Sequence, residues 1–127
     1  MTRRLPAVLW TLGVLASCLA PGVYVPDVPI LSVDKLVHVG LFLVFGLLWL
    51  ALYPARRVAV VAWGLGLAVA IEVLQQTLPI GRSGEVFDAA ADAVGLALAV
   101  GVRSALRLSR ASSRAAAPHA TRPQTGP

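Results

Sequence analysis

Four apolar stretches of about 20 residues each dominate the sequence, at residues 5–25, 35–53, 57–78 and 87–106. A helix of that length, at about 1.5 Å per residue, crosses the roughly 30 Å of hydrocarbon in a bilayer. Charged residues are 13% of the chain, whereas a soluble domain carries about 25%. We therefore predict an all-α integral membrane bundle of four transmembrane helices. Pro21 and Gly22 interrupt the first stretch, so its helix is expected to be short or tilted.

Basic residues fall on one side of the membrane if the four spans alternate, and acidic residues fall on the other. Of the 11 basic residues, all but Lys35 and Arg82 lie at the ends of the chain or in the loop at 53–57. These are Arg3, Arg4, Arg56, Arg57, Arg103, Arg107, Arg110, Arg114 and Arg122. Short loops rich in Lys and Arg stay in the cytoplasm. The sequence therefore predicts a multi-pass plasma-membrane protein with cytoplasmic N- and C-termini.

The basic residues also make nucleic acid an unsuitable partner, because they are scattered between apolar spans without interleaved aromatics. Residues 1–106 form the predicted transmembrane domain, and residues 107–127 form a basic, Pro/Ala-rich cytoplasmic tail that is expected to be disordered from about Ser112. Four arginines before the disordered part share one helical face, because they are spaced at i, i+4, i+7 and i+11. They are Arg103, Arg107, Arg110 and Arg114, and we expect anionic lipid headgroups near them.

Small residues recur every four positions in the last span, which permits close packing between helices in lipid. One line contains Ala91, Gly95 and Ala99, and a second contains Ala93, Ala97 and Gly101. We expect this helix to be the central one, and Gly64 and Ala68 give the third helix a similar face. Trp10, Trp49 and Tyr53 are candidates for anchors at the membrane interface. Four short helices bury little surface, which makes a homodimer plausible.

The single cysteine leaves an alternative open for the first span. Residues 1–18 have a basic start, an apolar core and a Leu-Ala-Ser-Cys run ending at Cys18, which looks like a lipoprotein cleavage box. Lipoproteins usually continue into a soluble domain, whereas three more apolar spans follow here. An uncleaved first helix is therefore the preferred interpretation.

Ionisable and amide side chains gather where three spans reach the outer side. Such groups are costly inside a membrane and require a partner or a wet cavity. Pairs four residues apart share a helix face, as in Asp34 with His38 and Asp88 with Asp92, and Glu72 lies about 10 Å below its helix end. The candidate pocket residues are Asp34, Lys35, His38, Glu72, Gln75, Gln76, Arg82, Asp88 and Asp92.

Two interpretations of this constellation remain open. It is either a hydrogen-bonded lock between helices or an outward-facing pocket for a ligand. One histidine among mixed oxygens has no recognised ligand spacing, so we predict no metal. The chain has no nucleotide-binding loop and no Ser or Cys nucleophile signature, so we predict no cofactor, and these motifs assign no catalytic residue.

The constellation resembles a known family. Asp34, Lys35 and His38 look like an Asp-Lys-x-x-His element, followed by Phe42 and Gly46. Glu72 with Gln75 looks like a Glu-x-x-Gln element, and Arg82, Asp88 and Gly95 resemble the Arg, Asp and Gly of the last loop and helix. This pattern is similar to the VanZ-like family of small bacterial membrane proteins, whose founding member is associated with low-level resistance to the glycopeptide teicoplanin. Asp92 stands where that family usually carries Asn.

The resemblance implies a role in the bacterial cell envelope, and two kinds of function are consistent with it. A binding protein would hold a lipid headgroup, a lipid-linked envelope intermediate or a lipoglycopeptide, with Arg82 on an anionic group. An enzyme would act on a lipid-linked substrate through His38 and a carboxylate. A purely structural lock between the helices is the third alternative. Because the family places an amide at position 92, we expect Asp92→Asn to be tolerated.

Overall fold

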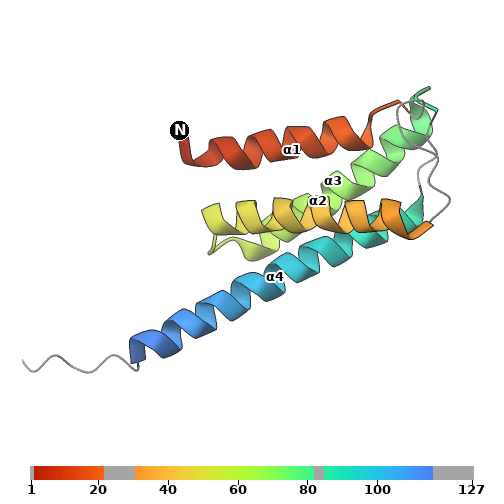
Figure 1. Ribbon diagram of the computed structural model, residues 1–127. Helices are drawn as coiled ribbons and strands as arrows, with labels where there is room; N and C mark the ends of the chain where they lie inside the picture. The colour runs from red at the N-terminus through yellow and green to blue at the C-terminus, as the bar shows by residue number, and fades with distance from the viewer. Residues whose placement is uncertain (1, 22–30, 82–84, 116–127) are drawn as a thin grey trace, which may run out of the picture.

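The computed structural model describes residues 2–21, 31–81 and 85–115, which form four α-helices (Figure 1). A short 3-10 turn, η1 (Thr2–Arg4), leads into α1 (Leu5–Cys18). The longer helices are α2 (Leu31–Leu52), α3 (Arg57–Thr77) and α4 (Val86–Ala115). Figure 1 shows that successive helices run in opposite directions. The described residues contain no strand, so the prediction of an all-α fold is confirmed.

Three of the helices are long and apolar enough to cross a membrane. Their candidate spans are Val33–Leu52, Arg57–Thr77 and Val86–Arg114, with mean hydropathies of 2.1, 2.0 and 1.5. α1 has 14 residues, or about 21 Å of helix, which is shorter than the hydrocarbon core of a typical bilayer. The expectation of a short first helix is therefore confirmed. Residues 22–25 of the predicted first span lie outside the described residues.

Both α2 and α3 pack against each of the other helices, with α2 making the most extensive contacts, whereas α4 packs on α2 and α3, so the expectation that α4 is the central helix is not confirmed. α4 packs most extensively on α2 and less on α3, along the first of its two lines of small residues. A Cβ at Gly95 would collide with the backbone carbonyl of Val39, so the two backbones touch at this position. Ala91 and Ala99, one turn before and after Gly95, are buried. In the second line, Ala97 and Gly101 are exposed, because a helix can press only one face so closely against one neighbour.

The tryptophan side chains form hydrogen bonds and ring contacts between neighbouring helices. The indole N–H of Trp10 donates to the backbone carbonyl of Leu41 at 3.0 Å, and that of Trp49 donates to Thr11 Oγ1 at 3.1 Å. Trp49 also meets the ring of Trp63 edge-on, with ring centroids 4.7 Å apart. These contacts join α1, α2 and α3 through the partly buried side chains of Trp10 and Trp49 and the exposed ring of Trp63. Trp10 and Trp49 therefore hold helices together, a role that their predicted place at the membrane interface did not include.

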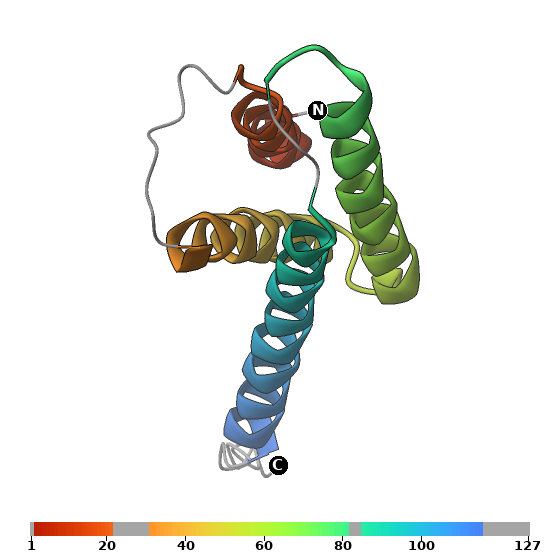
Figure 2. The same cartoon turned by 90° about the vertical axis from the view of Figure 1, so that its right-hand side faces the viewer.

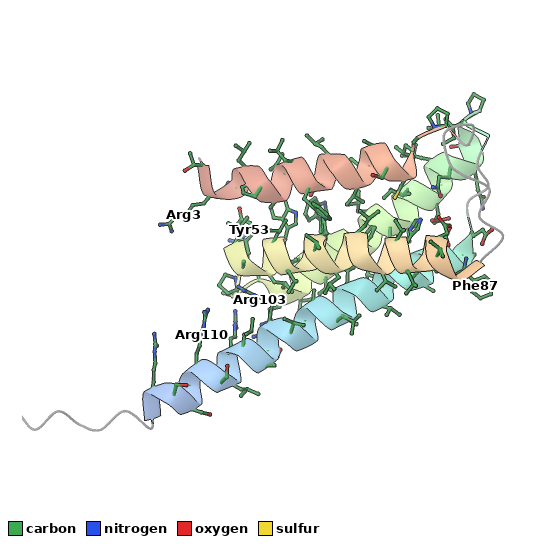
Figure 3. The ribbon with its side chains drawn as sticks, in the orientation of Figure 1. Arg3, Tyr53, Phe87, Arg103 and Arg110 are labelled. Carbon is green, nitrogen blue, oxygen red and sulfur yellow. The ribbon has the colours of Figure 1, made fainter. Side chains whose placement is uncertain are left out.

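The opposite end of the bundle from Phe87 is basic, as Arg3, Arg103 and Arg110 show in Figure 3. Arg107 donates to the carbonyl of Pro54 at 3.0 Å, and Arg57 donates to Ser104 Oγ at 3.3 Å. The turn between α2 and α3 is thereby attached to the second half of α4. That helix continues to Ala115, past the position at which composition predicted disorder to begin, because the residues from 107 to 115 keep good helix formers. The remainder of the predicted disordered tail lies outside the described residues.

We predict that Gly95→Ala destabilises the bundle by about 1–3 kcal/mol, the usual cost of overpacking. The added methyl group would meet backbone atoms of α2, which cannot rotate away. Gly101→Ala is the matched control, because a Cβ there meets nothing within 4 Å. Thermal melting of the purified protein in detergent measures the difference, and equal melting temperatures for the two variants would contradict the close approach of α2 and α4.

We also predict that reporters fused after Arg110, or inserted between Pro54 and Arg57, are cytoplasmic, and that one inserted at Gly84 is external. The reason is the separation of basic and acidic residues to opposite ends of the helices. Alkaline phosphatase and fluorescent protein fusions report the two sides. A cytoplasmic signal from position 84 would reverse the orientation.

Candidate functional site

The helices bring six ionisable side chains to the end of the bundle that carries Phe87 (Figure 3). α2 begins there, α3 ends there and α4 begins there (Figure 1). The first turns of α2 and α4 are therefore adjacent, and Glu72 approaches them from the last turns of α3. We call this set the polar cluster, and it comprises Asp34, Lys35, His38, Glu72, Asp88 and Asp92.

The centre of the polar cluster is a buried pair, His38 and Asp92. The Nδ1–H of His38 donates to Asp92 Oδ1 at 2.9 Å, because an ionised carboxylate only accepts. The side chain of Asp92 is 0% exposed and that of His38 is 2% exposed. This bond fixes the plane of the imidazole and turns its Nε2 toward Asp88 Oδ2, which is 4.0 Å away.

Asp88 lies between the buried pair and the surface. Its Oδ1 accepts from Lys35 Nζ at 3.1 Å, and Lys35 also donates to Glu85 Oε2 at 3.2 Å. Glu85 is half exposed, whereas the side chain of Asp88 is only 5% exposed. Lys35 therefore donates to Oδ1 of Asp88 on the side nearer the surface, and Oδ2 faces the imidazole of His38 in the interior. Each carboxylate oxygen of Asp88 has a different neighbour.

Glu72 is buried, at 9% exposure, without a hydrogen bond to either carboxylate oxygen. The charges of His38, Asp88 and Asp92 are close enough to act on it, and the backbone of Glu85 is nearby but outside hydrogen-bond geometry. Oδ2 of Asp92 is also buried without a partner. Most buried polar atoms in proteins are hydrogen-bonded. These three oxygens are therefore acceptors that the described part of the chain leaves unused.

Other predicted site residues lie elsewhere. Gln75 is buried, and its amide donates to the carbonyl of Cys18 at 2.8 Å, so it joins α3 to the end of α1. Gln76, the next residue, is exposed. Arg82 lies outside the described residues. The polar face predicted for α3 is thus divided, with Glu72 in the polar cluster and Gln75 in a helix contact. Spacing along the sequence could not separate the two, because residues three apart share a face.

Cys18 is the single cysteine of the chain, and it ends α1 with its side chain buried. Near it, an apolar hollow of about 310 Å³ lies between α1 and α2, lined by Leu9, Trp10, Val14, Ser17 and Leu41 among others. The hollow contains none of the ionisable residues of the polar cluster. It is part of the apolar surface of the helices, and the chemistry is concentrated in the cluster.

Oxygen and nitrogen donors of Asp34, His38 and Asp88 lie within 4.8 Å of one another. An oriented imidazole beside carboxylates can take part in proton transfer, bind a cation, or accept hydrogen bonds from a polar headgroup. Sequence spacing brought the correct pairs onto shared faces. It could not show that the faces of α2 and α4 meet, because that depends on which small residues pack closely together, at Gly95 of α4 and at Gly46 of α2.

The sequence profile of the VanZ/LLP1 family matches residues 7–107. No curated protein and no solved structure gives a significant match. The matched region contains all four helices down to the basic half of α4, together with every residue of the polar cluster. With three apolar helices that could cross a membrane and a profile match over most of its length, this chain belongs to the VanZ/LLP1 family of membrane proteins.

Proposed function

We propose that the chain is a plasma-membrane protein of the cell envelope whose polar cluster binds the headgroup of a lipid, a lipid-linked envelope intermediate or a lipoglycopeptide. The observation that carries this proposal is the buried carboxylate of Glu72, whose two acceptor oxygens have no hydrogen-bond partner among the described residues. A charged group without a partner is costly inside a membrane, and at the centre of a span this cost is about 3 kcal/mol or more. A ligand with hydrogen-bond donors would remove that cost.

The chemistry of the polar cluster favours a headgroup that presents hydroxyl or amine groups. Four of its six side chains are carboxylates, which accept hydrogen bonds and attract positive charge. Sugar hydroxyls and primary amines supply such donors, and both occur on envelope lipids and lipoglycopeptides. The anionic contact assigned to Arg82 stays a prediction, because that residue lies outside the described residues. A role in glycopeptide tolerance follows as part of the proposal.

A second function is favoured by the bond between Asp92 and His38. A carboxylate on Nδ1 fixes one tautomer and leaves Nε2 to accept a proton, an arrangement suited to a general base. In that case the chain would be an enzyme acting on a lipid-linked substrate. No hydroxyl or thiol nucleophile in the described residues is shown next to His38, which is why binding is the preferred function.

At the opposite end, we propose that the arginine face of α4 contacts anionic headgroups. Arg110 and Arg114 are exposed beyond the other helices, whereas Arg107 is engaged with Pro54. Each basic residue near an anionic surface contributes about 1 kcal/mol to membrane attachment. Both termini would then be cytoplasmic, with α1 completing a four-span bundle. Pairing with a second copy stays a prediction.

Glu72→Gln is the substitution that best separates a binding site from a structural lock. Because Glu72 has no hydrogen-bond partner among the described residues, replacing its carboxylate by a neutral amide should leave the melting temperature unchanged or raise it. Ligand binding should weaken about tenfold or more, since a bond to a charged group contributes about 1.5–3 kcal/mol. Lipid mass spectrometry of the purified protein measures which headgroups are retained, and melting in detergent measures stability.

Glu85→Gln is the matched control, because it makes the same chemical change at the same end on a half-exposed side chain. We expect it to retain the same lipids as the wild-type chain. If Glu72→Gln lowers the melting temperature and lipid retention is unaltered, the polar cluster is a structural lock. If no headgroup class is enriched with the wild-type chain, the binding proposal fails.

Asp92→Asn separates binding from catalysis through His38. The amide oxygen can still accept from the Nδ1–H of His38, so membrane abundance should stay close to that of the wild-type chain. A binding role then predicts unchanged tolerance to a lipid-tailed glycopeptide. An acid–base role predicts a loss on the order of 10²–10⁴ in rate, because the amide no longer stabilises a charged imidazole. Inhibitory concentrations at matched abundance decide between the two, and a strong loss would favour the enzyme.

A further inference from the structure

We propose that Asp34, His38 and Asp88 form a binding site for a divalent metal ion, with Zn²⁺ as the best-fitting ion. The three residues come from two helices, and their donor atoms lie within 4.8 Å of one another. Ligand bonds of about 2.0–2.2 Å place two donors of one tetrahedral ion about 3.3–3.6 Å apart. The most widely separated of the three donors therefore need to approach by at most about 1.2–1.5 Å to share an ion.

The separation between His38 Nε2 and Asp88 Oδ2 points to a shared ion. At 4.0 Å it is too long for a hydrogen bond, which requires about 2.7–3.2 Å. Two ligands of one tetrahedral ion are about 3.3–3.6 Å apart, so a small side-chain adjustment would bring these two atoms onto one ion. The other oxygen of Asp88 is bound to Lys35, so it does not compete for the position. Oδ2 is thus aimed at the imidazole across a gap that an ion would fill.

The pair of His38 and Asp92 supplies a second, independent observation. Metal-binding histidines almost always donate their other ring N–H to a carboxylate, which fixes the tautomer and raises the basicity of the ligating nitrogen. His38 does this with Nδ1, which leaves the lone pair of Nε2 directed toward Asp88. Asp92 is completely buried and keeps one oxygen without a partner, as does Glu72 with both of its oxygens. These residues have the geometry expected around a metal ligand.

Charge at this end of the bundle also favours a cation. Within the described residues, all five acidic side chains gather here, and Lys35 is the one lysine or arginine among them. The acidic side chains are Asp34, Glu72, Glu85, Asp88 and Asp92. One imidazole with two carboxylates is a nitrogen and oxygen set that suits Zn²⁺ with a fourth position open to water or to a ligand oxygen. Asp34 is exposed and provides the route by which the ion enters.

The test uses the full-length protein without an affinity tag, purified in detergent, stripped with a chelator and titrated with ZnCl₂. Elemental analysis after desalting is expected to give one Zn²⁺ per chain. Asp34→Asn, Asp88→Asn and His38→Gln should each weaken the dissociation constant at least about tenfold, and Asp92→Asn should weaken it about 10–100-fold through His38. Glu85→Gln removes the same charge as Asp88→Asn without removing a proposed ligand, so its affinity should match that of the wild-type chain.

Melting temperatures establish that each variant is folded. If His38→Gln does not fold, pulsed electron paramagnetic resonance of the Cu²⁺-loaded wild-type chain tests the same ligand, because a coordinated imidazole gives a signal from its remote nitrogen. Absence of that signal, absence of retained Zn²⁺, or equal loss of affinity in Glu85→Gln and Asp88→Asn would each overturn the proposal. Metal uptake is measured without added lipid, so its failure is distinguishable from failure of headgroup binding.

Discussion

The structure depends on the close approach of α2 and α4 at Gly95. With no side chain at that position, the backbone carbonyl of Val39 lies directly against α4. Val39 follows His38 in α2, and Asp92 precedes Gly95 by one turn in α4. The contact that brings the backbones together therefore also places His38 on Asp92 at 2.9 Å. In lipid, close packing of small residues is a principal source of helix association. One glycine thus supports both the packing and the chemistry.

The number and approximate positions of the helices were predictable from the sequence, because a stretch of about 20 consecutive apolar residues in a membrane has few alternatives to a helix. The spacing of Asp34 with His38 and of Asp88 with Asp92 was likewise sufficient to place each pair on one face. The sequence did not show which helix faces pack against one another. α4 carries two lines of small residues, and nothing in the sequence shows that the line containing Gly95 is buried while Gly101 is exposed. For the same reason, the packing of α2 and α3 against each of the other helices was not predicted.

Polar residues of α3 show a similar limit. Glu72 and Gln75 are one turn apart and both buried, yet they serve different neighbours. Gln75 donates to the carbonyl of Cys18 at the end of α1, where the helix leaves a carbonyl without an intrahelical donor. Glu72 has no such partner. A buried amide that satisfies a helix end stabilises the bundle, whereas a buried carboxylate without a partner destabilises it. We therefore expect Gln75 to stabilise the bundle and Glu72 to act in the proposed binding site.

The distribution of charge gives the bundle two different ends. Arginines at one end are exposed or bonded to the turn between α2 and α3, where they are compatible with a surface of anionic lipid. At the other end, the acidic side chains outnumber the described basic ones, and two of them bury oxygens without partners. A structural lock would pair such oxygens within the chain, because each unpaired one costs stability. Among the described residues these oxygens have no partner, and either of the proposed ligands, an ion or a donor-rich headgroup, would complete the polar cluster.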